Sequence, residues 1–505
     1  MHRLLTITTL LLAPMLLCGC EGIFKDLDDL PAPPPDCDET ASDFSGGDGT
    51  ADDPFRICTA DDFNEIRAGR SYMAENVHFA LLRDIDLDDR NDVELILVST
   101  PDLTLFDDEP PESVDQDPVD TTEPRPFLGT FDGRGHTIEN VVIRNRPEFA
   151  IGLFRHIGPE GTVKNLNLAG IDVEGVIGAA ALAGINEGTV ENCHVTNGRV
   201  VQYSDQGESF GIFIAALVGH NRGDIINSTA ANMTIEALTI TGGLVAVNDL
   251  DARIVDSQVD VTVRADNNIR QIHGDLNAKL AGGLVGINIG EIHRSRSRGS
   301  VRIQGNTPSS DTSSAVGGLV GAATPLSTIT ESASSTGVEA SITFPAIGDE
   351  GTLTAGGLVG LNSGLLQDTY SSGSVTTTNS TLRPGRDEYV GGLVGLHLLY
   401  QPDDLEVDQI PTPTIKRSFG FGEIATAQRG ATYRGGLVAM SFSSIPSITL
   451  EVTDSYWLDE IADDNTWGQP LTSAQFRSPS SFPGWSFDDI WQIPTGSPHP
   501  VLAWE

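Results

Sequence analysis

The sequence predicts an all-β fold, a parallel β-helix in which short strands coil around one long axis. One glycine-rich unit, clearest at Gly282-Gly283-Leu284-Val285-Gly286, recurs along the chain in closer and looser copies. Repeated units of about 20–50 residues are typical of solenoids, whose stacked units share one continuous core. Between the copies, apolar residues alternate over short stretches, which indicates strands because side chains face the same way at every second position.

A leucine recurs at one position of this unit, and we expect it in the core of every coil. Successive leucines are separated by 27 residues (Leu217 to Leu244) to 44 residues (Leu393 to Leu437). The marker leucines are Leu153, Leu182, Leu217, Leu244, Leu284, Leu319, Leu358, Leu393 and Leu437.

The pattern divides the chain into five segments. They are a lipoprotein signal peptide (1–19), an acidic Pro/Gly tether (20–53), an N-terminal cap with the first coils (54–137), the repeats (138–456) and a C-terminal cap (457–505). An acidic insertion at 99–126 interrupts the third segment. The formal net charge of −41 argues against nucleic acid or an anionic membrane surface as a partner. Residues 1–126 hold 30 of the 71 acidic residues but only 8 of the 30 Lys and Arg, as expected of a solvated front segment.

The first residues have the form of an export signal, with a basic start and an apolar run too short to span a bilayer. The end of this run, Leu17-Cys18-Gly19-Cys20, resembles a bacterial lipoprotein signal. The resemblance implies cleavage before Cys20, acylation of Cys20, and, with Glu21 next, an outer-membrane location and display at the cell surface. An ordinary secretory signal cut nearby is the alternative.

The tether carries a proline run and then Ser45-Gly46-Gly47-Asp48-Gly49, a composition typical of extended and flexible linkers. Cys37 and Cys58 flank the start of the fold and could pair in an oxidising compartment. Cys193 lies alone inside a repeat, where we expect a small buried thiol.

A helix is predicted directly after Thr59, because a hydroxyl cap is followed by two acids and by Phe63 and Ile66 three apart. Such a helix would cover the open N-terminal edge of the stack. The acidic stretch 84–92 suggests calcium, but an EF-hand loop needs Gly at its sixth position and Glu at its twelfth, where Asp89 and Leu95 stand. We therefore expect no cofactor and no metal site, with calcium as a weak alternative.

Each repeat divides into three predicted extended segments. The first is Gly-Gly-Leu-Val-Gly, followed by an Asn-x-Gly turn such as Asn288-Ile289-Gly290, where left-handed backbone geometry is cheap. The second ends at a small hydroxyl or thiol residue, and the third carries alternating apolar residues. We expect the small residues to stack as an inward ladder, about 4.8 Å from coil to coil; they are Cys193, Ser228, Ser257, Ser295, Ser332, Thr369, Ser418 and Ser455.

Insertions between repeats follow a pattern as well. Most fall between the third segment and the next glycine pair, so they should leave from one corner and form a face of loops, which in repeat proteins is often the binding face. These insertions are 202–210, 264–281, 304–315, 344–355 and 379–390, whereas 397–414 leaves from a different corner.

The C-terminal segment holds all five tryptophans and no repeat. Large aromatic side chains suit a cap that covers the last coil. A carbohydrate-stacking platform is the alternative.

The unit Gly-Gly-Leu-Val-Gly-x-Asn-x-Gly-x-Ile with a downstream Ser resembles the GLUG repeat of bacterial surface proteins and IgA-peptidase-associated proteins. The resemblance covers roughly residues 48–505 and includes Gly129-Thr130-Phe131-Asp132-Gly133. It implies a right-handed parallel β-helix displayed outside the cell, in a family of adhesin-like proteins.

No zinc-peptidase, nucleophile-elbow or phosphate-loop motif is present. Asp256, Asp368 and Asp454 precede ladder positions and are expected to face solvent, and four lysines are too few for a lysine-rich groove. We expect a non-catalytic, monomeric protein that acts in adhesion or in binding a glycan, a host protein or a neighbouring cell's protein. A polysaccharide lyase or hydrolase is the alternative, and a structural stalk or spacer is the second alternative. Three or more convergent acids or arginines in one cleft would favour the enzyme.

Overall fold

The computed structural model describes residues 37, 44–68, 70–87, 126–146, 150–176, 178–202, 213–266, 279–306, 313–343, 352–378, 387–400, 409–426, 431–445, 448–462 and 467–505. The chain divides into two units, Met1–Cys37 and Asp38–Glu505, and Cys37 is the described residue of the first. The predicted leader with Cys20, most of the tether and residues 99–125 lie outside the described residues. Cys37 and Cys58 are both disulfide-bonded, and their pairing with each other stays a prediction.

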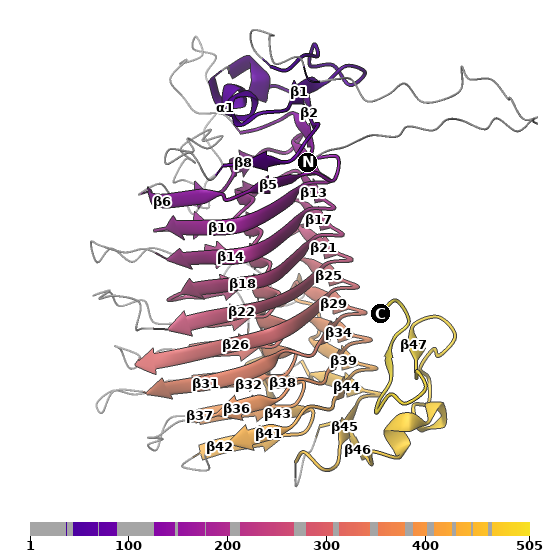
Figure 1. Ribbon diagram of the computed structural model, residues 1–505. Helices are drawn as coiled ribbons and strands as arrows, with labels where there is room; N and C mark the ends of the chain where they lie inside the picture. The colour runs from indigo at the N-terminus through magenta and orange to yellow at the C-terminus, as the bar shows by residue number, and fades with distance from the viewer. Residues whose placement is uncertain are drawn as a thin grey trace, which may run out of the picture. The chain divides into compact units, whose positions relative to one another are not determined.

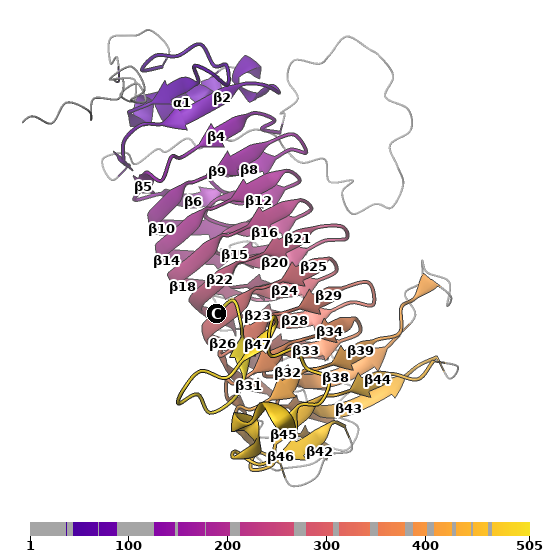
Figure 2. The same ribbon diagram turned by 90° about the vertical axis from the view of Figure 1, so that its right-hand side faces the viewer.

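The second unit is a parallel β-helix, as predicted. Four sheets run along its length and successive coils add one parallel strand to each (Figure 1). We name these sheets A, B, C and D. Seen from the side, the strands lie one above another like rungs (Figure 2).

A full coil passes through four strands, not the three segments predicted. In one coil β23 (Leu280–Gly282) lies in sheet D, β24 (Val285–Asn288) in C, β25 (Glu291–His293) in A and β26 (Arg296–Asn306) in B. The glycine-rich unit is therefore a corner between two strands. A Cβ atom on Gly282 would lie 1.9 Å from the Val285 carbonyl oxygen, so the corner has room only for glycine.

Sheets D and C meet at this corner, and each contains nine strands in the described residues. Besides β23, sheet D contains β7 (Ala150–Ile151), β11 (Gly178–Ala179), β15 (Phe213–Ala215), β19 (Ile240–Gly242), β27 (Ser313–Gly317), β32 (Thr352–Gly356), β37 (Asp387–Gly391) and β42 (Ala431–Gly435). Besides β24, sheet C contains β8 (Phe154–Ile157), β12 (Ala183–Asn186), β16 (Val218–Asn221), β20 (Val245–Asn248), β28 (Val320–Ala323), β33 (Val359–Asn362), β38 (Val394–Leu399) and β43 (Val438–Ser443).

Sheet A is built of short strands. Besides β25 it contains β1 (Phe55–Ile57), β2 (His78–Leu81), β4 (Thr130–Asp132), β9 (Thr162–Lys164), β13 (Thr189–Glu191), β17 (Asp224–Ile226), β21 (Arg253–Val255), β29 (Thr328–Thr330), β34 (Leu365–Gln367), β39 (Thr414–Lys416) and β44 (Glu451–Thr453).

Sheet B has the longest strands and carries the site described below. Besides β26 it contains β3 (Ile85–Asp86), β5 (Thr137–Glu139), β6 (Val142–Arg146), β10 (Asn167–Gly175), β14 (His194–Gln202), β18 (Thr229–Ala237), β22 (Gln258–Asp266), β30 (Ala333–Ser334), β31 (Gly337–Thr343), β35 (Tyr370–Ser371), β36 (Val375–Thr377), β40 (Phe419–Gly420), β41 (Ile424–Thr426), β45 (Tyr456–Leu458) and β46 (Gln469–Leu471).

The marker leucines align in one column in the core. All nine have no exposed surface. The Leu284 backbone N–H donates to the Leu319 carbonyl at 2.8 Å, and Leu319 donates to Leu358 at the same distance. Aligned apolar side chains give the stack a continuous interior, which is the main source of stability in a solenoid.

The small residues form a second column, and hydrogen bonds explain their type. From Cys193 to Ser455 they are at most 2% exposed. The Ser257 N–H donates to the Ser295 hydroxyl at 3.2 Å, and that hydroxyl donates to the His293 carbonyl at 2.9 Å. A hydroxyl thus satisfies backbone groups that the tight turn between sheets A and B leaves unpaired.

Left-handed backbone geometry occurs at a different place from the predicted one. Neither Asn288 nor Gly290 has a positive φ. The residue before each small inward residue does, with φ between 44° and 53°, at Asn192, Asn227, Asp256, Arg294, Glu331, Asp368, Arg417 and Asp454. This single-residue turn joins sheet A to sheet B, and Asn and Asp adopt it at small energetic cost.

The Asn of the Asn-x-Gly motif is instead buried at the end of five sheet C strands, where neighbouring asparagines form an amide ladder that Ala323 interrupts between Asn288 and Asn362. Asn186, Asn221, Asn248, Asn288 and Asn362 have no exposed surface. The Asn248 side-chain amide donates to the Asn288 side-chain carbonyl at 2.8 Å. His397 takes the equivalent place in β38, with its Nδ1 3.1 Å from the Asn362 amide nitrogen.

The helix expected after Thr59 is α1 (Ala60–Ala68), and a short 3-10 helix, η2 (Arg70–Met73), follows it. The Thr59 hydroxyl accepts from the Asp62 N–H at 3.1 Å, while the Asp62 carboxylate accepts from the Thr59 N–H at 2.8 Å. This reciprocal cap fixes the start of the helix. α1 lies at the N-terminal end of the stack (Figure 1).

The predicted insertions lie largely outside the described residues, but the strands that flank them show where they leave. Each of the five joins the end of a sheet B strand to the start of a sheet D strand, as between β14 and β15 or β22 and β23. Residues 400–413 connect β38 of sheet C to β39 of sheet A instead.

Candidate functional site

The C-terminal tail follows a different course from the predicted end cap. β45 and β46 extend sheet B at the last coils, and the chain then continues through η5 (Gln475–Arg477), η6 (Pro479–Ser481) and the antiparallel pair β47 (Trp491–Gln492) and β48 (Val501–Leu502). Figures 1 and 2 show the tail in yellow, turning back beside the stack toward β26. The tail therefore covers one side of the β-helix as well as its C-terminal end.

An aromatic strip on sheet B explains why the tail lies there. Tyr370 and Phe419 are in register on β35 and β40, with ring centroids 4.9 Å apart. Trp491 of the tail lies 5.9 Å from the Phe419 ring and Trp485 lies 4.4 Å from Trp491. Burying this strip removes a large apolar area from water.

The five tryptophans therefore do not form a stacking platform. Trp457, Trp485 and Trp491 are buried, while Trp467 and Trp504 are partly buried and packed against the same core. None of the five is fully exposed, because these side chains pack against the core.

A buried ion pair anchors the tail. Asp368 was expected to face solvent, but its side chain is only 1% exposed. Both Asp368 carboxylate oxygens accept from the Arg417 guanidinium, and Oδ1 also accepts from Trp491 Nε1 at 3.2 Å. The hydrogen bond to Asp368 raises the pKa of Arg417. Asp256, at the same turn position, stays partly exposed and pairs with Arg294 at 2.9 Å.

Further along, the tail reaches strand β26 and forms a polar pocket there. Trp504 Nε1 donates to the Glu331 carbonyl at 2.9 Å. The Tyr370 hydroxyl donates to Glu505 Oε2 at 2.7 Å, and Arg296 lies 3.7 Å from Glu505 Oε1. The pocket has a volume of about 320 Å³; it is lined by Arg296, Arg298, Ser335, Tyr370, Gln492 and Glu505, with Ala333, Pro494 and Val501 completing the wall.

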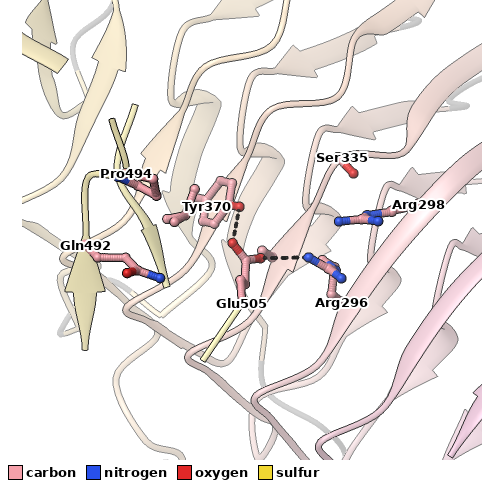
Figure 3. Close-up of a pocket in the computed structure, with 9 residues that line it drawn as sticks. Arg296, Arg298, Ser335, Tyr370, Gln492, Pro494 and Glu505 are labelled. Carbon is pink, nitrogen blue, oxygen red and sulfur yellow. Dashed lines mark hydrogen bonds and ion pairs between the residues drawn. The ribbon is translucent and has the colours of Figure 1, made fainter. Parts of the chain in front are cut away.

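Figure 3 shows the Glu505 carboxylate between Tyr370 and Arg296, with Arg298 and Ser335 beyond Arg296 and with Gln492 on the opposite side. The Arg296 side chain is 15% exposed and donates to Gln258 Oε1 at 2.7 Å. Arg298 is exposed and makes no hydrogen bond or ion pair with any described residue. The pocket thus combines one engaged guanidinium with one that is available to a ligand.

Burial affects the titratable groups of the pocket. It raises the pKa of Glu505, against the opposing effects of Tyr370 and Arg296. Burial also raises the pKa of the Tyr370 hydroxyl, and the negative charge of the neighbouring Glu505 raises it further. Burial and the charge of Arg298 lower the pKa of Arg296. Since Tyr370 stays protonated, it is a hydrogen-bond donor and not a base.

Three charged side chains, Arg296, Arg298 and Glu505, converge in this pocket. Three or more convergent acids or arginines in one cleft is the criterion that favours an enzyme. Their types do not suit glycoside hydrolysis, which uses two carboxyl groups on opposite sides of the bond. Among the lining side chains there is one carboxyl group, that of Glu505, which already accepts from Tyr370, and one serine, Ser335, with no histidine in the lining. The arrangement is suited to holding an anionic group.

The other predicted site residues do not converge. The marker leucines and the inward ladder are core residues, separate from the pocket. Cys193 is free and buried, and burial raises the pKa of its thiol to about 12. Among the described residues, no group of three or more His, Cys, Asp or Glu side chains could hold a metal ion.

Sequence reasoning missed the pocket because it searched for lysines and for motifs. The signal was present in Arg294-Ser295-Arg296-Ser297-Arg298, where arginine alternates with serine. Period-2 alternation on one strand places Arg296 and Arg298 on the same outward face.

The fold and the pocket define a class of protein: a parallel β-helix with a small cationic pocket between one sheet and its own tail. No model of a known protein family matches the chain. Membership of the GLUG family therefore stays a prediction. No described helix is long and apolar enough to cross a membrane.

Two proteins share part of the sequence. The chain is 34% identical over 161 residues to a provisionally named Gly-rich membrane protein of Evansella cellulosilytica, covering 31% of this chain and 16% of that protein. It is 35% identical over 101 residues to halomucin of Haloquadratum walsbyi, covering 20% of this chain and 1% of halomucin. The chain thus spans a small part of the length of either relative.

Two solved structures match the chain with low TM-scores. A provisionally named immunoglobulin A1 protease from Bacteroides ovatus has a TM-score of 0.40 at 14% identity, covering 92% of this chain and 96% of that one. A protein named IgA1 protease has a TM-score of 0.35 at 17% identity, and the match covers 74% of this chain and 23% of that chain.

Proposed function

We propose that this chain is a lipid-anchored β-helix of the bacterial cell envelope that binds an external ligand without altering it chemically. The observation that carries the proposal is the pocket at Arg296 and Arg298, where one guanidinium has no partner among the described residues. An arginine held on a rigid strand at the mouth of a concave site is typical of recognition of an anionic group. The long stack serves as the scaffold that presents it.

Binding is tested with Arg298→Gln. Because Arg298 is exposed and supports no described contact, the variant should fold like the wild type. Losing a charged hydrogen-bonding group should weaken binding by about 10- to 100-fold. Glycan and matrix-protein arrays identify a ligand for the mature wild-type protein, and titration then measures the loss.

Arg302→Gln is the matched control, since Arg302 is on the same strand, outside this pocket, and pairs with Glu339. Equal binding by wild type and Arg298→Gln would reject the pocket as the binding site. A reducing-sugar assay and a peptide-cleavage assay run on the same ligands, and product formation would replace the non-catalytic proposal with an enzyme.

The anchor is tested separately by Cys20→Ser. We expect this variant to lose both the membrane-fraction location and incorporation of a labelled fatty acid, because the acylated thiol is removed. Cys18→Ser should keep both, as the preceding cysteine is not the predicted acylation site. A Cys20→Ser protein that still takes up label would contradict the assignment.

A further inference from the structure

We infer that the ligand of this pocket is a single sugar residue that carries one carboxylate, such as a terminal uronic acid, and that Glu505 competes with this carboxylate for Arg296. The inference rests on the proposed function, since it names the ligand class of that same site. It follows from the charges, the room and the polar groups of the lining.

The charges favour one negative group and no more. Arg296 and Arg298 supply two positive charges, and the ionised form of Glu505 offsets one of them. The preceding coil places the exposed Asp260 in register with Arg298, so a chain of negative charges extending over β22 would meet a carboxylate. Like charges at such short range disfavour a polyanion, whereas a monoanion can pair with Arg298 alone.

The volume of the pocket favours a ligand with one sugar ring. A volume of about 320 Å³ is at the lower end of the range for small-molecule sites. On the Tyr370 side of the pocket, the Trp491 ring packs against Tyr370 and Phe419 and limits the room for a longer ligand.

The remaining lining suits hydroxyl groups. The Gln492 amide nitrogen donates to the Leu502 carbonyl at 3.3 Å, which leaves its side-chain oxygen as an acceptor. Ser335 offers a hydroxyl next to Arg298, and Pro494 and Val501 provide an apolar wall for the carbon face of a ring. A sugar has hydroxyls that both donate and accept, so it can satisfy these groups together.

Glu505 gives the site a pH dependence with a definite sign. The groups that face it are Tyr370 from β35 and Arg296 and Arg298 from β26, and His499 of the tail lies against the Tyr370 ring. Burial raises the pKa of Glu505 and lowers that of His499. As the pH falls through the Glu505 pKa, this carboxyl loses its charge and releases Arg296, while a uronate remains ionised. Affinity therefore rises toward acid pH.

The experiment uses the mature chain and isothermal titration with D-glucuronate, D-glucose and inorganic phosphate at about pH 7.5 and about pH 5. Glucuronate should bind at least about tenfold more tightly than glucose or phosphate, and more tightly at the lower pH. Arg298→Gln should lose this preference, whereas Arg302→Gln should keep it. Glu505→Gln should bind glucuronate at about pH 7.5 as the wild type does at the lower pH, since its amide carries no charge.

Equal binding of glucose and glucuronate, or tighter binding of phosphate, would overturn the ligand class. If an array ligand nevertheless depends on Arg298, the proposed function stands and this inference alone fails. If glucuronate binding and array binding are both indifferent to Arg298→Gln, both fail. A Glu505→Gln variant that keeps the wild-type pH profile would remove Glu505 as the competing group.

Discussion

Asp368→Ala is expected to release the C-terminal tail from the side of the β-helix. The change leaves the largely buried Arg417 guanidinium without its counter-charge and Trp491 Nε1 without its acceptor. Breaking a buried ion pair by removing one partner costs about 3–5 kcal/mol. Because Trp485, Trp491 and Trp504 lie in the docked tail and Trp457 is the one tryptophan on a sheet B strand, tryptophan fluorescence in a urea titration mainly follows release of the tail, while circular dichroism follows the sheets.

Asp256→Ala is the matched control for this prediction. Asp256 has the same left-handed turn geometry, with φ 52° against 53°, so both variants lose the same local backbone preference. Its ion pair with Arg294 is partly exposed to solvent, so losing the pair should add less than about 1 kcal/mol to the cost of the turn that both variants share. Equal losses in the two variants would show that the turn, and not the anchor, determines the effect.

The second large effect is the acid sensitivity that His397 introduces into the amide ladder. Burial lowers the pKa of His397 to about 4, against about 6.5 in the unfolded chain. Above about pH 6.5 His397 is neutral in both the folded and the unfolded state. Between about pH 6.5 and about pH 4 it is protonated in the unfolded chain but still neutral in the folded protein. The free energy of unfolding should therefore fall by about 3 kcal/mol across this range as the pH is lowered.

His397→Asn should remove this loss and restore the residue type found at Asn186, Asn221, Asn248, Asn288 and Asn362. Urea titrations between about pH 4 and pH 7.5 measure the free energy of unfolding of the wild type and of His397→Asn. The contributions of the other titrating groups cancel in the difference between the two proteins. His194→Asn is a comparison at a half-buried histidine outside the ladder, and its curve should stay closer to the wild type. Parallel curves for wild type and His397→Asn would contradict the assignment.

Some features could be predicted from the sequence because they repeat or act over a few residues. The marker leucines and the column from Cys193 to Ser455 recur once per coil, and stacking of like positions follows from the parallel architecture. The Thr59 cap lies within one helical turn of its partner Asp62. In contrast, the glycine pair gave no sign that it was a corner, since an extended strand and a tight bend both accept glycine.

The amide ladder shows a different limit. An Asn before x-Gly is typical of a turn, and the sequence does not reveal that successive asparagines stack inside the protein. The burial of Asp368 was equally hidden, because the same turn position predicts solvent exposure for Asp256 and for Asp368 alike. Only the docked tail distinguishes the two.

The sequence by itself determined the β-helix, its core columns and its capped start, because those interactions join neighbouring residues or equivalent positions of adjacent coils. The tertiary structure alone decided the course of the tail and the pocket that it closes. Those contacts join Tyr370 to Glu505 across 135 positions and Glu331 to Trp504 across 173. No period relates these residues, so only the folded chain brings a carboxyl group, a phenol and two guanidinium groups together.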